Sequence, residues 1–397
     1  MTLEKRTKLV LKIAPSEWIN ESRDKRELGV VKELGAEVLV MAKGRKSGVV
    51  DQVDGFDVYR MSTRPLGTYV PPAFNRIVSI FTWAHQVRKI GPQIISGHDL
   101  PALLIGYLSG IFISRKRKPK LVYDSHEFEL GRNVKRSRAA LLVILHLERF
   151  LMKRCAFSIM VNDSIADEVR RIHHLKQRPV VVRSIPENWE IDDRVCQEIR
   201  QKLLYAAESP GRAILLMYHG MICSGRGIEN LIRAAALCKD VMLVILGNAE
   251  NESYLETLQK MPACIRAGRR ILFYPAVPAE QLWKYIGAAD ISMMPILPVT
   301  KSYYYALPNK FFESIQALTP VIASDLPEMK NLIERYGIGF TCRPGSVRDI
   351  CRCIRCMCSD RTVYASYKEN VRRAKEELNW ENEKERLKKA YYKIIKP

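Results

Sequence analysis

Residues 213–246 read AILLMYHGMICSGRGIENLIRAAALCKDVMLVIL, and this stretch decides the fold. An apolar run at 213–218 is followed by a glycine-containing turn, a helical pattern at 227–237 and a second apolar run at 241–246. Two short apolar runs joined by an amphipathic helix predict a β-α-β unit of a parallel sheet. Because both runs are apolar along almost their whole length, we expect strands that are covered on both faces of the sheet.

The same alternation extends over the whole chain. Further runs expected to form strands occur at 8–13, 37–42, 93–96, 121–125, 157–161, 179–183, 271–274, 290–295, 321–324 and 339–342. The alternation falters between Ser184 and Arg212, where Pro186 and a polar helical segment at 192–206 separate two similar halves. A chain of 397 residues is also long for a single core. We therefore predict an α/β fold with two Rossmann-like, doubly wound domains joined near residue 190.

The composition is that of a globular protein, with 47% hydrophobic and 27% charged residues. The chain starts with the charged segment Met1–Arg6, so no secretory signal is expected. The longest apolar run, around 139–147, contains His146 and is too short to span a bilayer. These features predict a cytoplasmic protein.

The formal net charge of +21 calls for a polyanionic surface or ligand. Positive charge is concentrated in the run Arg115–Lys120 and in a helical segment from Arg138 to Arg154. Anionic lipid of the cytoplasmic leaflet fits such a surface, and the helical segment suits the membrane interface. A solvated basic face, with the helix packed against the sheet, is the alternative. Nucleic acid is not expected, because no basic run is interleaved with aromatic residues that stack on bases.

Four of the ten cysteines are closely spaced, at Cys351, Cys353, Cys356 and Cys358. Thiolates at short spacing can bind zinc or an iron–sulfur cluster. The segment 347–357 has a helical pattern, however, and on a helix Cys351 and Cys353 project about 200° apart, which makes convergence of four sulfur atoms difficult. We expect free cysteines that act as small hydrophobic residues, and no metal site.

The segment Tyr304–Glu313, YYALPNKFFE, is the richest in candidate binding groups. It enters a helix at Pro308, and free N–H groups together with the helix dipole make such a helix start an anion site. Lys310 places a positive charge in the first turn, where the dipole disfavours a cation, and a bound diphosphate would reverse that mismatch. Glu313 lies one turn after Asn309 on the same face, where a carboxylate can accept hydrogen bonds from ribose hydroxyls. The alternative is an ordinary early-turn glutamate and a solvated lysine.

The turn after the run at 213–218 follows the same logic. His219–Gly220 and the residues up to Gly227 let the backbone approach a ligand, and Arg226 can form paired hydrogen bonds with phosphate oxygens. Two anion-prone helix starts in one half of the chain are better evidence than either alone.

In the first half, His126 lies just beyond the carboxyl end of the run at 121–125, and His98 has a similar position. Ligands of open α/β sheets bind at this edge. The alternative for His126 is a helix or loop cap. The chain contains no G-x-S-x-G nucleophile turn, no H-E-x-x-H motif and no Walker phosphate loop.

Together these motifs resemble those of family 4 glycosyltransferases with the GT-B fold, particularly the bacterial "group 1" enzymes that build capsule, O-antigen or exopolysaccharide. The resemblance covers nearly the full length and rests on Leu307–Glu313, His219–Gly227, Tyr123–Glu127, Phe273–Val277 ahead of Ala288–Asp290, and Asn379–Glu381. It implies two Rossmann-like domains that face each other across a cleft. The expected parts are an acceptor domain at 1–190, a nucleotide-sugar donor domain at 191–375, and a C-terminal helix at 376–397 packing back on the N-terminal domain.

Residue roles follow from the resemblance. Glu313 looks like the second glutamate of the family's E-x7-E motif, which holds the donor ribose, and Lys310 and Arg226 look like the cations that stabilise the leaving diphosphate. His126 resembles the histidine that touches the donor sugar. These four residues are the expected catalytic groups. The expected donor-binding residues are Gly220, Arg226, Tyr274, Val277, Tyr305, Ala306, Leu307, Asn309, Lys310 and Glu313, with the loop 274–277 resembling the wall that receives the nucleobase.

The chain departs from the family pattern at two places. Tyr305 stands where the first motif glutamate is found, so recognition of sugar hydroxyls there must differ or come from backbone amides. Met221 and Ile222 stand where the family has an arginine soon after the glycine.

The resemblance implies a retaining, metal-independent hexosyltransferase that needs no cofactor. Its donor would be a nucleoside diphosphate sugar, with UDP favoured and GDP next. Its acceptor would be a lipid-linked or other glycan at the inner face of the cell membrane, in surface polysaccharide synthesis. Two alternatives are a non-catalytic polyanion-binding protein on the same fold and a nucleotide-sugar 2-epimerase, which would need an acid and a base in the cleft.

Overall fold

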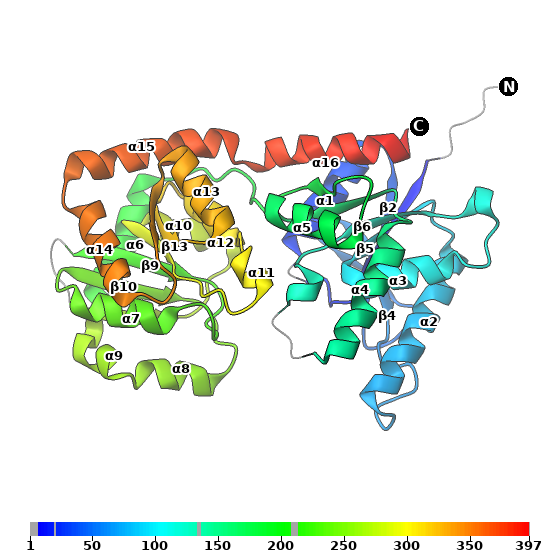
Figure 1. Ribbon diagram of the computed structural model, residues 1–397, viewed down its shortest axis with the longest axis horizontal. Helices are drawn as coiled ribbons and strands as arrows, with labels where there is room; N and C mark the ends of the chain where they lie inside the picture. The colour runs from blue at the N-terminus through cyan, green and yellow to red at the C-terminus, as the bar shows by residue number, and fades with distance from the viewer. Residues whose placement is uncertain (1–6, 20, 133–135, 208–212, 397) are drawn as a thin grey trace. The chain divides into compact units, whose positions relative to one another are not determined.

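The computed structural model describes residues 7–396, apart from 20, 133–135 and 208–212; the segment Met1–Arg6 lies outside the described residues. The chain forms two compact units, each built on its own, largely parallel sheet (Figure 1). The predicted α/β fold with two parallel-sheet domains is therefore confirmed. No helix in the described part of the chain is long and apolar enough to cross a membrane.

Unit 1 extends to Arg183 and includes the chain from Glu383 onward, whereas unit 2 spans Ser184–Asn382. The division after Arg183 has a physical basis, because Ile185 packs in one core with Phe311 and Phe312 of unit 2. The segment that links the two sheets in sequence is thus already part of unit 2.

Unit 1 contains an eight-stranded sheet in the order β3-β4-β2-β1-β5-β6-β7-β8. After β1, the chain first adds β2 to β4 on one side of it and then β5 to β8 on the other side. This is the arrangement of a doubly wound sheet. The strands are β1 (Leu9–Ala14), β2 (Glu37–Lys43), β3 (Val50–Val53), β4 (Phe56–Met61), β5 (Ile94–His98), β6 (Lys120–Asp124), β7 (Phe157–Met160) and β8 (Val180–Val181). The helices are α1 (Ser22–Glu33), α2 (Pro72–Ile90), α3 (Asp99–Ser109), α4 (Arg138–Met152), α5 (Asp163–His173) and most of α16 (Trp380–Ile395).

The hairpin of β3 and β4 was not predicted. The two strands are antiparallel, and β4 pairs in parallel with β2 at the edge of the sheet. Asp54 and Gly55 connect them with positive φ angles of 49° and 76°. Asp-Gly is a strong signal for a two-residue hairpin turn, so the turn of this hairpin could have been predicted from sequence.

Unit 2 contains a six-stranded, fully parallel sheet in the order β11-β10-β9-β12-β13-β14. Its strands are β9 (Ile214–His219), β10 (Val241–Leu246), β11 (Ile271–Tyr274), β12 (Ile291–Met294), β13 (Val321–Ser324) and β14 (Gly339–Cys342). Its helices are α6 (Asp193–Ala206), α7 (Ile228–Leu237), α8 (Glu252–Gln259), α9 (Pro262–Ala267), α10 (Leu282–Gly287), α11 (Lys301–Tyr304), α12 (Asn309–Gln316), α13 (Pro327–Tyr336), α14 (Val347–Cys358) and α15 (Arg361–Glu377). Strands β9 and β10 are almost wholly buried, as their apolar sequences predict.

The C-terminal helix α16 is tied to unit 1 by polar contacts. The Tyr391 hydroxyl donates a hydrogen bond to Glu27, and Lys8 Nζ donates one to the backbone carbonyl of Ile394 at 2.9 Å. These contacts explain why the chain from Glu383 onward belongs with the first sheet (Figure 1).

The closely spaced cysteines lie on α14. Cys351 and Cys353 are buried in the core of unit 2, whereas Cys356 is exposed. Among the described residues, the groups of side chains that could hold a metal ion consist of carboxylates and histidines, without a cysteine. The buried thiols therefore contribute apolar packing.

Candidate functional site

The carboxyl end of β9 and the start of α12 meet in unit 2. Strand β9 ends at His219, and Gly220 follows with a φ of 108°, a conformation that side-chain-bearing residues rarely adopt. A Cβ atom added to Gly220 would lie 3.9 Å from Nζ of Lys310, which comes from the first turn of α12. Gly220 and the Lys310 ammonium group therefore border the same space at the carboxyl end of β9.

Lys310 is a buried cation whose ammonium group is unsatisfied. The residue is 7% exposed, and Nζ has no hydrogen-bond partner in the described part of the chain. Nζ lies 3.8 Å from the ring centroid of Tyr218, and burial, with a contribution from Arg226, lowers the lysine pKa to about 7. An ammonium group held out of water without an acceptor is costly unless an anion binds beside it.

Glu313 lies one turn further along α12 and is oriented by His219. Nε2 of His219 donates a hydrogen bond to Oε2 of Glu313 at 3.1 Å. Burial lowers the pKa of His219, and the nearby Lys310 lowers it further, so the imidazole is neutral at pH 7. The carboxylate is partly exposed and keeps capacity to accept further hydrogen bonds.

Helix α12 begins at Asn309, with Pro308 as its N-cap residue rather than in its first turn as predicted. No side chain caps this helix start. The N–H of Phe311 donates to the Pro308 carbonyl, so the N–H groups of Asn309 and Lys310 are left for another acceptor, which suits an anion.

Arg226 is placed by two glycines that tolerate no side chain. A Cβ atom on Gly227 would come within 1.8 Å of the Pro295 carbonyl oxygen, and one on Gly225 within 2.9 Å of the Tyr303 ring. The Arg226 guanidinium lies over the Tyr303 ring, 4.9 Å from its centroid. Burial is the main cause of the lowered Lys310 pKa, and the like charge of Arg226 lowers it further.

The other predicted donor-binding residues are more dispersed. Tyr305 and Ala306 lie between α11 and α12 and are half-buried, Leu307 is buried in the core, and Asn309 is exposed. Tyr274 ends β11, which is separated from β9 by β10, and its hydroxyl lies 3.3 Å from that of Tyr285. Val277 packs against the same core cluster as Tyr274.

In unit 1, a second group of polar side chains surrounds a buried lysine at the centre of β1. Lys12 Nζ lies 3.0 Å from a carboxylate oxygen of Asp24, 2.5 Å from one of Glu27 and 2.8 Å from one of Asp124. These carboxylates outweigh the effect of burial and hold the pKa of Lys12 well above its usual value. Lys12 is thus the counter-ion that allows three carboxylates to be buried.

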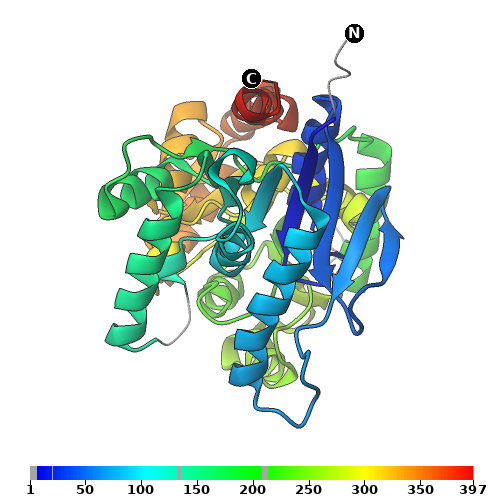
Figure 2. The ribbon, with the colours of Figure 1, turned by 90° about the vertical axis from the view of Figure 1, so that its right-hand side faces the viewer.

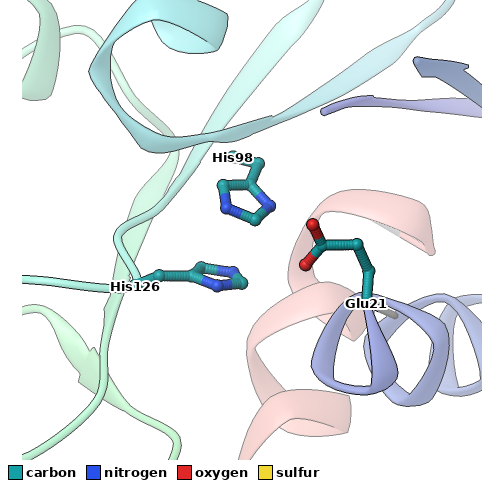
Figure 3. Close-up of side chains that lie close together, drawn as sticks. All are labelled: Glu21, His98 and His126. Carbon is teal, nitrogen blue, oxygen red and sulfur yellow. The ribbon is translucent and has the colours of Figure 1, made fainter. Parts of the chain in front are cut away.

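Two histidines, His98 and His126, lie beside these carboxylates; Figure 3 shows the two rings together with Glu21. The rings of His98 and His126 are stacked with centroids 3.7 Å apart. Nδ1 of His98 lies 2.8 Å from Asp24, and Nε2 of His126 lies 3.0 Å from Asp124. Burial alone would lower the pKa of His126, but Asp124 and Asp24 outweigh it and raise the pKa to about 10, so this ring is a cation at neutral pH.

A metal ion is one group that these residues could hold. Glu21, His98 and His126 bring three potential ligand atoms within 4.8 Å of one another (Figure 3), as do Asp24, Asp124 and His126. The carboxylates Asp24 and Asp124, however, already bind cationic side chains, namely Lys12 for both and Arg23 for Asp124. The negative charge of Asp24 and Asp124 is therefore already balanced by cationic side chains of the protein.

His126 and His98 were predicted from sequence, but the charged network that positions them was not. One signal was available, because Lys12 interrupts the otherwise apolar run at 8–13. A lysine in the middle of a buried strand requires a charged partner. The identity of its partners, Asp24 and Glu27 from α1 and Asp124 from β6, depends on tertiary structure.

Comparison with known proteins agrees with this architecture. Residues 201–374 match the family model "Glycosyl transferases group 1", and residues 30–184 match "Glycosyltransferase Family 4". Sucrose-phosphate synthase from Thermosynechococcus elongatus superposes with a TM-score of 0.74 at 17% identity, covering 98% of this chain and 99% of that one. HepE of Anabaena, in complex with UDP and glucose, has a TM-score of 0.74 at 14% identity, covering 97% and 100%. The lipopolysaccharide glycosyltransferase WaaG has a TM-score of 0.64 at 16% identity, covering 98% and 100%. No curated protein matches the chain by sequence.

The fold is thus that of the GT-B glycosyltransferases. The chain belongs to the family 4-like, group 1 glycosyltransferases, with one family model matched in each unit.

Proposed function

We propose that the protein is a retaining, metal-independent hexosyltransferase that uses a nucleoside diphosphate sugar and needs no cofactor. The observation that carries this proposal is Lys310, a buried ammonium group without an acceptor beside Gly220 and the uncapped start of α12. A diphosphate supplies the missing acceptor oxygens for Lys310, Arg226 and the free N–H groups.

The donor would be held by unit 2. Glu313, oriented by His219, would accept hydrogen bonds from the ribose hydroxyls, and Tyr274 and Val277 would border the nucleobase. The N–H groups of Tyr305 and Ala306 already donate to the backbone carbonyls of Lys301 and Tyr303, so the N–H of Leu307 and the side chain of Asn309 would contact the sugar and the phosphates. UDP is the favoured nucleotide, with GDP next; HepE of Anabaena, a structural neighbour, has been crystallised with UDP-glucose.

In the proposed reaction, the bond between the sugar C1 and the diphosphate oxygen breaks, and its electron pair stays on that oxygen. Lys310, Arg226 and the helix N–H groups stabilise the new charge, an effect worth about 3–4 kcal/mol for each well-placed donor. The acceptor oxygen bonds to C1 from the same face, and its proton passes to the leaving diphosphate. No side-chain nucleophile is required, and the cationic side chains replace a metal ion.

His126 would act as a hydrogen-bond donor to the sugar rather than as a base. An imidazolium with its pKa raised to about 10 carries both ring protons at neutral pH, so it cannot accept a proton there. Lys12, Asp24 and Asp124 would be positioning residues that keep the ring charged and fixed.

We further propose that the acceptor is a lipid-linked or other glycan of surface polysaccharide synthesis. The protein would act at the cytoplasmic face of the cell membrane, where its basic first unit meets anionic lipid. The charge of the chain, +21, supports this placement.

The test is thermal stabilisation of the purified protein by UDP, GDP, ADP and CMP without added metal. A ligand at about 100 times its dissociation constant adds about 2.7 kcal/mol to stability, which gives a clear shift. We expect one nucleoside diphosphate to stabilise the wild type and Lys260→Ala, an exposed control, but not Lys310→Ala. No shift with any nucleotide would contradict the proposal and favour a non-catalytic polyanion-binding protein.

A further inference from the structure

Helix α2 exposes an apolar stripe on its outward face. Phe74, Ile77 and Phe81 are 55%, 55% and 60% exposed, and their spacing of three and four residues places them on one side of the helix. Trp83 and Val87, by contrast, are buried against unit 1. A helix of a globular protein normally presents polar residues to water, so a second apolar face requires an explanation.

The stripe continues past the C-terminal part of α2. Arg88 lies on the same side of the helix as Phe74 and Phe81, and its guanidinium lies 5.2 Å from the ring centroid of Phe112. Phe112 follows α3 and is 83% exposed. It leads to a short 3-10 helix, Arg115–Arg117, whose three side chains are all exposed. We call the surface formed by Phe74, Ile77, Phe81, Arg88, Phe112 and Arg115–Arg117 the α2 face.

The nearby helix α4 also exposes apolar side chains. Helix α3 contacts both α2 and α4, and Figure 2 shows α2 (light blue) and α4 (green) on either side of α3 (cyan). On α4, Leu142, Val143 and Phe150 are exposed, and the Arg154 guanidinium lies 3.5 Å from the Phe150 ring centroid. Every exposed phenylalanine in the described part of the chain lies on or beside these three helices, at positions 74, 81, 112 and 150.

The charge of this part of the chain is strongly one-sided. Between Asp57 and Asp124 the chain carries ten lysines and arginines and a single carboxylate, Asp99. Asp99 is paired with Arg132 and does not oppose the basic side chains of the α2 face. An exposed apolar stripe flanked by cations alone is the pattern of an element that lies in the interface of an anionic membrane.

We infer that the α2 face docks on the surface of a bilayer containing anionic lipid, with Phe74, Ile77, Phe81 and Phe112 inserted among the acyl chains near the headgroups. Arg88 and Arg115–Arg117 would contact the lipid phosphates. This inference deepens the membrane placement in the proposed function and rests on it, but it assigns docking to α2 as well as to the cationic helix at Arg138–Arg154 predicted from sequence.

Charge favours a membrane over a second copy of the chain as the partner that covers the α2 face. A second copy brings another net charge of +21 against a face that has no carboxylate to receive it, whereas anionic lipid complements the face. The stripe also offers aliphatic Ile77 and few hydrogen-bond donors at its centre, which fits acyl chains better than nucleic-acid phosphates.

The experiment is co-sedimentation of the full chain with vesicles of phosphatidylcholine alone or with added phosphatidylglycerol, without nucleotide. We expect binding to the anionic vesicles, weakened at least tenfold in the triple variant Phe74→Ser/Ile77→Ser/Phe81→Ser. Replacing Arg115, Lys116 and Arg117 by serine should weaken binding to anionic vesicles by about fivefold per charge. The control Leu237→Ser/Ile265→Ser, at exposed apolar positions of unit 2, should bind as the wild type does.

Five outcomes would overturn the inference. The first four are absence of binding to anionic vesicles by the wild type, unchanged binding by the triple variant, equal loss in the unit 2 control, and a wild-type dimer that the triple variant abolishes. Tight binding to single-stranded DNA in place of vesicles, lost in the triple variant, would assign the face to nucleic acid and also overturn it. The nucleotide-dependent thermal shift needs no membrane, so it tells failure of this docking surface apart from failure of the proposed function.

Discussion

Lys12 and Lys310 are both buried lysines in the site-forming regions of their units, yet their surroundings are opposite. Lys12 touches three carboxylates, and its pKa is raised well above the usual value. Lys310 has no hydrogen-bond partner among the described residues, and its pKa is lowered to about 7. Burial alone therefore does not decide the pKa of a lysine. Lys12 contacts three carboxylates that outweigh burial, whereas the charge of Glu313 does not offset burial and the like charge of Arg226 at Lys310.

The largest expected effect comes from removing the satisfied lysine. Lys12→Met leaves Asp24, Glu27 and Asp124 buried without their common partner, so the free energy of unfolding should fall by about 3–5 kcal/mol. Urea denaturation measures it, with Lys260→Met as the exposed control. A Lys12→Met variant as stable as the wild type would show that the carboxylates have other means of compensation.

Removing the unsatisfied lysine should have the reverse effect on stability. Lys310→Met relieves the cost of a buried, unpaired ammonium group, so the ligand-free protein should become more stable by about 1–4 kcal/mol. The same variant should lose about 10²–10³-fold in turnover, because a donor to the leaving group is gone. Denaturation and transferase assays on the same preparation check both parts. A less stable Lys310→Met variant would mean that the lysine is satisfied in the folded protein.

The two lysines should also make the free energy of unfolding depend on pH in opposite directions. Lys310 has a folded-state pKa of about 7, below its unfolded value, so the unfolded chain binds more protons between about pH 7 and 10.5. Its contribution to stability therefore rises with pH across that window. Lys12, with a raised pKa, contributes stability that is complete below its unfolded pKa and is lost at higher pH. The wild type should gain stability relative to Lys310→Met as the pH rises above 7, and a difference independent of pH would contradict the assignment.

Binding of a diphosphate should reverse the shift on Lys310. The bound anion raises the lysine pKa, so affinity is fully present below pH 7 and falls by up to about tenfold per pH unit above it. Calorimetric titration with UDP in buffers of different ionisation enthalpy should reveal proton uptake near pH 8. Binding without proton uptake there would show that Lys310 is already protonated in the free protein.

The smallest effect is expected at the histidines of unit 1. Asp24→Asn removes one of the two carboxylates that raise the His126 pKa, so that pKa should fall from about 10 by about one unit or more. NMR titration of the ring measures the change. The wild-type ring should show no titration near pH 6.5, and a midpoint there would contradict the cationic state.

Much of the fold was predictable because parallel β-α-β structure requires apolar strands and amphipathic helices to alternate along the sequence. The strands at 241–246, 271–274, 321–324 and 339–342 have the predicted bounds, since they are apolar runs between turn residues. The β3–β4 hairpin was missed because β3 has only four residues, two of them polar, and because Asp57 and Arg60 interrupt the apolar residues of β4, so neither strand is a continuous apolar run.

The candidate site was predictable in part. His126 follows β6 in unit 1, whereas His219 ends β9 and Lys310 and Glu313 lie in the first turns of α12 in unit 2. In a parallel α/β sheet such positions lie at the carboxyl edge of their own sheet. Asp24 and Glu27 lie inside α1 and look like ordinary helix-surface residues in the sequence. Their burial depends on α1 packing over β1, which no local pattern reports.

The sequence by itself determined the alternation of strands and helices, the division into two α/β halves and the glycines that bend the backbone at strand ends, because these depend on local periodicity and steric limits. Only the tertiary structure decided which buried charge is satisfied. Lys12 and Lys310 are the same residue type, but Lys12 contacts carboxylates from α1 and β6, whereas Lys310 Nζ has no hydrogen-bond partner among the described residues. Charge–charge energies depend on separation in space and on burial, and both are set when distant segments pack together.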